Sequence, residues 1–248
     1  MPSDGGRLWA PKVMHDAMQR KLALIHTSAV FLTVETMMRD MYREIMPDVH
    51  LINIMDDSLL ATVMAEQRIS PAVTRRMCAY VEAAAIAGAD AVLSLCSSLG
   101  PTIDVARELV DIPVIKIDDA HTEKAAREAS RIGVMATVQT TLQPTVDLIQ
   151  EKAAAIDKTV EIHQSLSSAA FEALMGGEKD RHDTMVIDAA RKLAPQVDVI
   201  LFAQASMARL APRVEQETGL SVLTSPRLAI EYTKRVLDGL REKDQPGA

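Results

Sequence analysis

The sequence predicts an α/β fold of two pseudo-twofold-related halves, each a mainly parallel four-stranded sheet flanked by helices. Short apolar runs rich in β-branched residues alternate with longer segments of helical pattern, an order typical of parallel sheets. The chain also contains an internal repeat. When the sequence is shifted by 108 residues, residues 89–99 align with 197–207, and the register continues until 112–115 meets 220–223. Two similar halves usually form one cleft, and we expect the functional site between them.

The first half, residues 1–130, contains four runs that predict strands. They are Leu22–Thr27, His50–Met55, Ala91–Leu95 and Pro113–Ile117. The segments between them predict helices at residues 30–45, 70–87, 102–109 and 120–131. The start of the second of these helices is well marked, because Ser70 is a good capping residue and Pro71 favours the first helical turn.

The second half, residues 131–248, has the same order of elements. Its predicted strands are Ile132–Ala136, Val160–His163, Val199–Ala203 and Ser221–Leu223, and its helices 142–155, 168–175, 183–193, 207–218 and 228–241. Residues 21–27 also match 131–137, so the repeat covers most of each half. No Gly/Ser linker separates the halves. We therefore expect tight packing between them, with a C-terminal helix returning onto the first half.

Composition excludes several classes of protein. The chain is 48% hydrophobic and 25% charged, as in ordinary globular proteins. Its net charge is −7 and it has no basic stripe, which argues against a nucleic-acid partner. No apolar run approaches the ~20 residues of a membrane span, and the first residues do not resemble a signal peptide. Two distant cysteines, Cys78 and Cys96, form no disulfide framework, so we expect a cytoplasmic protein with reduced thiols.

No phosphate-binding glycine loop and no pair of histidines at metal-ligand spacing is found, so we expect no nucleotide and no metal. In open parallel sheets, ligands bind beyond the carboxyl ends of the strands. Polar and hydroxylated residues follow the predicted strands at 26–28, 56–58, 96–98, 118–119, 137–141, 164–165, 204–206 and 224–225. Such residues could bind a small carboxylate, although Ser and Thr are also ordinary helix caps.

Cys96 is the residue most suited to chemistry. It lies between a predicted strand and a predicted helix, where backbone amides and the helix dipole lower the pKa of a thiol. A thiolate there could act as base or nucleophile. The alternative is a buried inert cysteine, which Cys78 fits well. The repeat places Gln204 at the position equivalent to Cys96, and an amide cannot transfer protons at neutral pH.

Residues 88–98 and 112–115 resemble the first cysteine motif of the aspartate/glutamate racemase superfamily, which includes hydantoin and allantoin racemases, maleate isomerase and arylmalonate decarboxylase. Val134–Thr137 resembles its central strand, and Asp198–Leu201 resembles the strand before its second cysteine. The resemblance extends over about residues 21–240. It implies two pseudosymmetric halves, an active site between them, no cofactor and a homo-oligomer such as a dimer.

The resemblance also implies roles for individual residues. Cys96 corresponds to the first-half cysteine, and Ser97 and Ser98 to residues that bind the substrate carboxylate. Thr137 and Gln139 lie near central-strand residues that do the same. From their places at strand ends, we add as substrate-binding candidates Thr27, Ser28, Gln204 and Ala205.

The missing second cysteine leaves several mechanisms open. The chain could be an isomerase or racemase in which His26 or His163 replaces the second acid/base group. It could be a decarboxylase resembling arylmalonate decarboxylase, with one cysteine protonating an enediolate. Covalent addition of Cys96 to an unsaturated acid, as in maleate isomerase, is a third reading. A protein that only binds carboxylates is the alternative outside enzymes.

Overall fold

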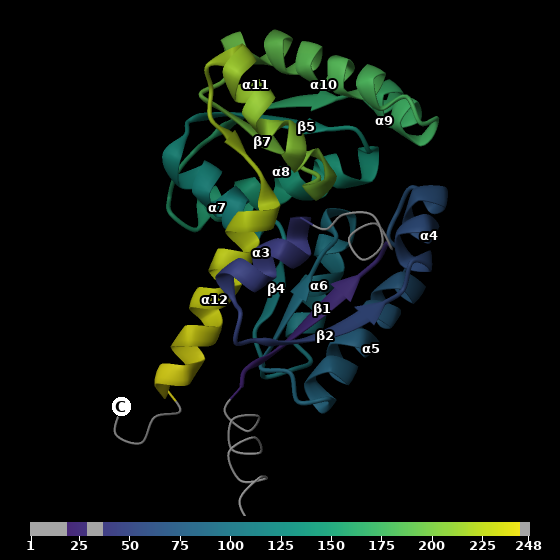
Figure 1. Cartoon of the computed structure of the whole chain (residues 1–248), viewed down its shortest axis with the longest axis vertical. Helices are drawn as coiled ribbons and strands as arrows, with labels where there is room; N and C mark the ends of the chain where they lie inside the picture. Colours follow the sequence, from purple (N-terminus) through teal and green to yellow (C-terminus); the bar gives the residue numbers. More distant parts are fainter. Residues whose placement is uncertain (1–18, 29–36, 244–248) are drawn as a thin grey trace, which may run out of the picture.

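The computed structural model describes residues 19–28 and 37–243 of the chain (Figure 1). They form two four-stranded sheets with strand orders β2-β1-β3-β4 and β6-β5-β7-β8, and every strand pair is parallel. The strands are β1 (Lys21–His26), β2 (His50–Met55), β3 (Ala91–Ser94), β4 (Val114–Lys116), β5 (Arg131–Ala136), β6 (Glu161–Leu166), β7 (Val199–Phe202) and β8 (Val222–Leu223). The predicted α/β class with two similar halves is confirmed.

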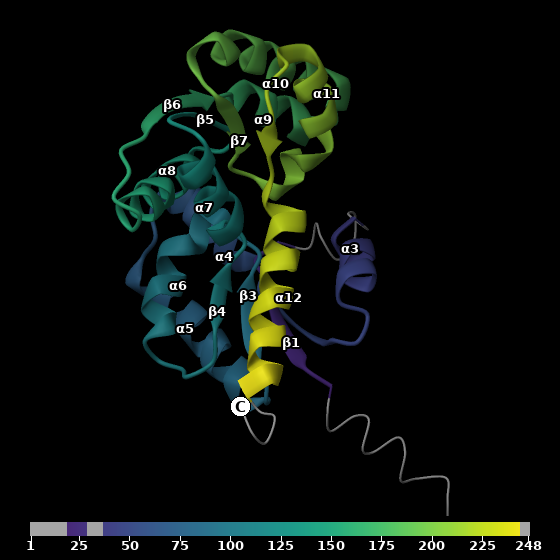
Figure 2. The same ribbon diagram turned by 90° about the vertical axis from the view of Figure 1, so that its left-hand side faces the viewer.

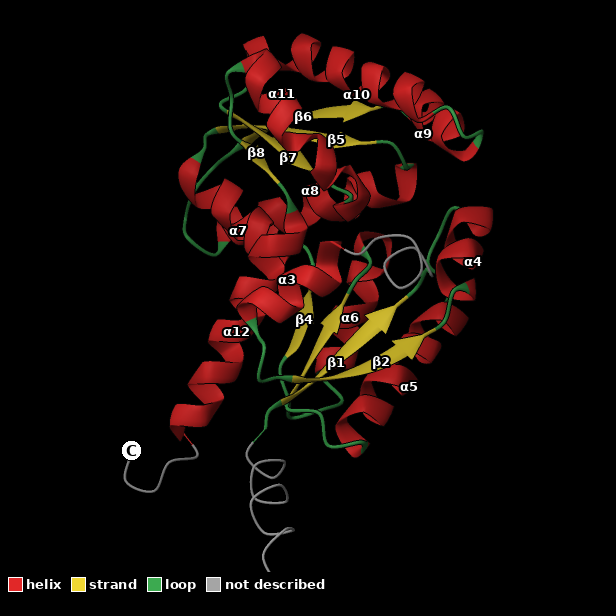
Figure 3. Cartoon of the chain, viewed as in Figure 1, coloured by secondary structure: helices red, strands yellow, loops and turns green. Residues whose placement is uncertain are grey.

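Helices cover both faces of the first sheet because its strands alternate apolar side chains between the faces. On one face, Ala23 and Ile25 of β1 pack with α4 (Ser58–Glu66), α5 (Pro71–Ile86) and α6 (Gly100–Arg107). On the other face, Leu22 and Leu24 pack with α3 (Met37–Ile45) and with α12 (Ser225–Lys243). Figure 3 shows the strands of this sheet running toward the second half.

The second sheet is covered in the same way. One face packs against α9 (Ser168–Met175), α10 (Lys179–Leu193) and α11 (Ala211–Thr218). The other packs against α7 (Asp119–Glu128) and α8 (Gln139–Ala154).

Helices α7 and α12 connect the halves, because each packs on the sheet of the other half. Helix α7 follows β4 of the first sheet, yet Ala125 belongs to the apolar cluster of β5 in the second. Helix α12 follows β8, yet Ile230 and Leu237 pack with β1 and β3 of the first. Figure 2 shows α12 running beside β3 and β4. The C-terminal helix does return onto the first half, and the division at residue 130 remains a prediction.

Several elements differ from the expected ones. Helix α4 is not predicted from the sequence, and the predicted helix at 207–218 is a 3-10 helix over Ala205–Leu210 followed by α11. Strand β6 extends to Leu166, three residues beyond the predicted end at His163. Residues 30–36 of the first predicted helix lie outside the described residues. No helix in the described ranges is long and apolar enough to cross a lipid bilayer.

Candidate active site

The strand register makes Cys96 and Gln204 equivalent positions. Ile25 of β1 pairs with Ser94 of β3, and Met135 of β5 pairs with Phe202 of β7. Two residues further along the chain, the same register places Thr27 opposite Cys96 and Thr137 opposite Gln204. The local backbone also agrees, since φ and ψ are −140° and 112° at Cys96 and −130° and 128° at Gln204. Both residues end an extended segment and precede a 3-10 turn.

Cys96 is buried, and three hydrogen-bond donors lie near its sulfur. The Thr27 hydroxyl and the backbone N–H groups of Ser98 and Leu99 favour the thiolate. Burial has the larger effect, and with the nearby Asp118 carboxylate it raises the pKa of Cys96. The expectation of a lowered pKa is therefore wrong. The amides and hydroxyl are in place, but desolvation outweighs them, so Cys96 rests as a thiol.

Gln204 binds the start of α8 through its side-chain oxygen. Its Oε1 accepts hydrogen bonds from the Thr137 N–H at 2.6 Å, the Val138 N–H at 3.1 Å and the Thr137 hydroxyl at 3.1 Å. Three donors that meet at one oxygen resemble an oxyanion hole in geometry. In this half the amide of Gln204 fills it.

The hydroxyls of Ser97 and Ser98 are held by protein partners. Ser97 donates to Asp118 Oδ1 at 3.0 Å, and Ser98 Oγ lies 2.9 Å from Thr140 Oγ1. The second contact crosses from the loop after β3 to the first turn of α8, so the two halves meet beside Cys96. The Thr141 hydroxyl donates to the Val138 carbonyl within the first turn of α8, and Val138 at the N-cap position provides no side-chain cap to this helix.

The two candidate histidines lie apart from Cys96. His26 lies on the same face of β1 as Leu22 and Leu24, whereas Cys96 packs in the apolar cluster on the opposite face of the sheet. The His26 Nε2 lies 2.8 Å from Asn53 Oδ1, and burial lowers the pKa of the imidazole. His163 is the third residue of β6, not its last, with its Nε2 2.9 Å from a Glu161 carboxylate oxygen. Because the strand continues to Leu166, the carboxyl end is three residues away.

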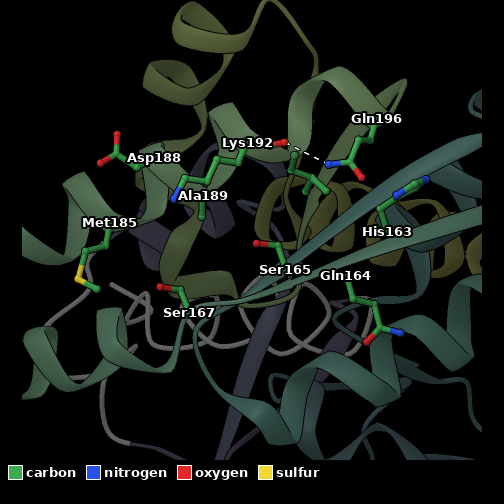
Figure 4. A pocket seen from close by; sticks show the side chains of 10 residues that line it. His163, Gln164, Ser165, Ser167, Met185, Asp188, Ala189, Lys192 and Gln196 are labelled. Carbon is green, nitrogen blue, oxygen red and sulfur yellow. Dashed lines mark hydrogen bonds between the residues drawn. The ribbon is translucent and has the colours of Figure 1, made fainter.

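His163 instead lines a groove of about 490 Å³ between β6 and α10 (Figure 4). Its other lining residues include Asp188 and Lys192. This groove lies on the α10 face of the second sheet, away from Cys96.

The remaining substrate-binding candidates have varied surroundings. Gln139 is the first residue of α8 and is exposed. Ser28 follows β1 and is half-buried. Ala205 packs in the apolar cluster shared with α12, which leaves its methyl group in the core. Within the described part of the chain, no group of three His, Cys, Asp or Glu side chains could hold a metal ion.

A buried acid and imidazole lie beside the Cys96 loop at the start of α7. Asp118 is 3% exposed, and burial, aided by neighbouring Asp119, raises its pKa to about 7. His121 is fully buried, its Nε2 lies 3.8 Å from Asp118 Oδ1, and the backbone of Asp118 and Phe202 lies close to its ring. Burial lowers its pKa to about 4. Asp118 stands among the polar strand-end residues of the sequence, but no sequence signal indicates His121.

Asp118→Asn changes how stability depends on pH. The wild-type carboxyl ionises near pH 3.8 when unfolded and near pH 7 when folded. The stabilisation from its folded-state proton is therefore complete below about pH 4 and is lost as pH rises through about 7. Relative to the variant, the wild type should lose up to about 4 kcal/mol between these limits. Urea unfolding at several pH values measures the difference, with Asp147→Asn as the exposed control. If the difference in unfolding free energy between wild type and Asp118→Asn does not change with pH, the raised pKa of Asp118 is contradicted.

Comparisons with known proteins agree with this architecture. The sequence model of the Asp/Glu/Hydantoin racemase family matches residues 22–233. Glutamate racemase from Francisella tularensis is similar in structure, with 14% identity, 90% of this chain and 82% of that chain covered, and a TM-score of 0.67. Allantoin racemase from Klebsiella pneumoniae has 18% identity, 88% coverage of both chains and a TM-score of 0.61.

A variant of arylmalonate decarboxylase is also similar, with 17% identity, 88% of this chain and 94% of that chain covered, and a TM-score of 0.58. No curated protein matches the chain. These likenesses establish a shared fold, and the family match extends over most of the sequence. The chain therefore belongs to the Asp/Glu/hydantoin racemase family.

Proposed function

We propose that the protein is a cofactor-independent isomerase or racemase-type enzyme that moves a proton at the carbon next to a carboxylate of a small acid. Cys96 is its single acid/base group. The observation that carries this proposal is the convergence of Thr27 and two backbone N–H groups on the Cys96 sulfur at a strand end where the halves meet. Those donors would stabilise the negative charge that forms on the sulfur when it becomes a thiolate during the reaction.

The proposed reaction has two steps. The Cys96 thiolate takes a proton from the substrate carbon, and the electron pair moves into the carboxylate or carbonyl to give an enolate. The resulting thiol then returns a proton. Return to the same face of the same carbon gives exchange alone, whereas return to a second carbon conjugated with the enolate gives a net isomerisation with a single acid/base group. Hydrogen-bond donors facing the enolate oxygen would stabilise the charge that develops there. Because Cys96 rests as a thiol, its proton must pass to water before the first step.

The direct test is hydrogen exchange in D₂O with a panel of small acids, including malate, aspartate, allantoin, hydantoins and maleate. Incorporation of deuterium next to the carboxylate or carbonyl supports the proposal. A panel that binds and protects Cys96 without exchange would support a carboxylate-binding protein instead. Conversion of maleate without exchange in the saturated acids would indicate covalent addition by Cys96.

The raised pKa predicts the pH profile of Cys96. The rate of its alkylation by iodoacetamide should increase with pH, with a midpoint above the ordinary thiol value of 9.0, because the thiolate is the reactive form. Mass spectrometry of the modified peptide after timed quenching measures the rate separately from that of Cys78. A midpoint below 9.0 would mean that the donors outweigh burial in solution.

A decarboxylase is the second candidate, and the resting state of Cys96 favours it. Loss of CO₂ from a 2-substituted malonic acid leaves an enediolate, which needs a proton donor rather than a base. A thiol that is protonated at neutral pH supplies that proton in a single step. Release of CO₂ from phenylmalonate, absent in Cys96→Ala, would select this reaction over isomerisation.

A further inference from the structure

The orientation of the Gln204 amide is fixed by chemistry. Two of the three groups that contact its inner atom are the backbone N–H groups of Thr137 and Val138, which can only donate. The inner atom must therefore be the carbonyl oxygen, and the NH₂ group must occupy the other side. Among the described residues, the structure gives this NH₂ group no hydrogen-bond partner. Gln204 is half-buried, so its two amide hydrogens remain for water or a ligand.

This arrangement changes what the second half presents to a ligand. The N–H groups of Thr137 and Val138, which precede α8, are already used by Gln204, so an anion does not reach these two groups directly. Instead, these N–H groups polarise the Gln204 amide and so affect its NH₂ group. An amide whose oxygen accepts three hydrogen bonds is a stronger donor through its nitrogen, because linked hydrogen bonds polarise one another. The NH₂ group is thus a donor without an acceptor in the described part of the chain, at the position equivalent to the Cys96 thiol.

We propose that Nε2 of Gln204 is a fixed hydrogen-bond donor to a carboxylate or enolate oxygen of the substrate, on the side of the site opposite Cys96. This inference rests on the proposed function of Cys96. Its consequence is a one-sided site, in which the first half exchanges the proton and the second half holds the negative oxygen. Proton exchange then occurs on one face of the substrate carbon and preserves its handedness.

Two alkylating reagents test the inference without knowledge of the substrate. Iodoacetate and iodoacetamide both alkylate a thiolate, forming an S–C bond and releasing iodide. Only iodoacetate carries a carboxylate on the attacked carbon, as the proposed substrates do. The ratio of the two rates at Cys96 therefore reports carboxylate recognition, while the iodoacetamide rate alone reports the reactivity of the thiol. The same ratio measured in urea-unfolded protein gives the reference.

Two variants separate hydrogen bonding from charge. Gln204→Glu keeps an oxygen for the three donors but loses both amide hydrogens, and Gln204→Met removes the donor without adding charge. We expect the ratio to fall about tenfold in Gln204→Met, the effect of one hydrogen bond to a charged group, and further in Gln204→Glu. Gln164→Met, an exposed change on β6, should leave the ratio unchanged. Thermal unfolding checks that each variant is folded.

The outcomes distinguish this inference from the proposed function. A wild-type ratio in Gln204→Met overturns the donor role, even if Gln204→Glu is impaired, because the loss would then be due to charge alone. Such a result leaves the role of Cys96 intact. If Cys96 reacts no faster with iodoacetamide than buried Cys78 at any pH, and no acid protects it, the proposed function itself is wrong.

Discussion

Cys96→Ala should lower deuterium exchange into the substrate by about 10³-fold or more, the usual effect of removing the group that transfers the proton. The reason is geometric as well as chemical. The Thr27 hydroxyl and the backbone amides near position 96 cannot take a proton from carbon at neutral pH, and the neighbouring Asp118 carboxyl accepts a hydrogen bond from Ser97. Cys96→Ser should be nearly as inactive, since a serine hydroxyl is a far weaker acid than a thiol.

The matched control is Cys78→Ala, which removes the other thiol of the chain. Cys78 is buried in α5, and its pKa is also raised by burial, but it lies outside the strand ends. Its loss should affect stability and leave exchange close to the wild-type rate. Exchange is measured by NMR or mass spectrometry of the acid after incubation in D₂O. If Cys96→Ala exchanges deuterium at the wild-type rate, the cysteine mechanism is wrong.

The repeat allowed the structural equivalence of Cys96 and Gln204 to be predicted from sequence. Residues 89–99 match 197–207 at a shift of 108, and residues 21–27 match 131–137 at a shift of 110. The matching strands have the same register in their sheets, because the apolar pattern that generates the repeat also fixes which residues pair. Thr27 with Cys96 and Thr137 with Gln204 follow from this. The protonation state of Cys96 does not follow from sequence. The helix start and its amides are local features, whereas the burial that outweighs them depends on packing between distant segments.

The histidines show the same limit. Placing His163 at a strand end depends on the last residue of β6, and strand ends are among the least certain features of a sequence. His26 does lie at the end of β1, but alternation along the strand turns it to the face opposite that of Cys96. His121 is buried because α7, which follows the first sheet in the chain, packs against the second sheet. No local sequence pattern indicates this packing.

Gln204→Cys should convert one-sided exchange into racemisation. The turn that follows each position is the same, with the Leu99 N–H bonded to the Cys96 carbonyl at 3.2 Å and the Met207 N–H bonded to the Gln204 carbonyl at 3.0 Å. A thiol at position 204 would therefore meet Thr137 as Cys96 meets Thr27. With a thiol on each side, one can remove the proton from one face while the other returns a proton to the opposite face.

The measurement is the optical rotation of a single enantiomer of the exchanging acid over time in D₂O. The wild type should incorporate deuterium with rotation preserved, whereas Gln204→Cys should lose rotation at a rate comparable to its exchange. Gln204→Ser is the control, because it opens the same space without a usable acid. Exchange with retained handedness in Gln204→Cys would show that positions 96 and 204 do not lie on opposite faces of the substrate carbon. Racemisation by the wild type would require an acid/base group in the second half that neither Gln204 nor the placement of His163 supplies.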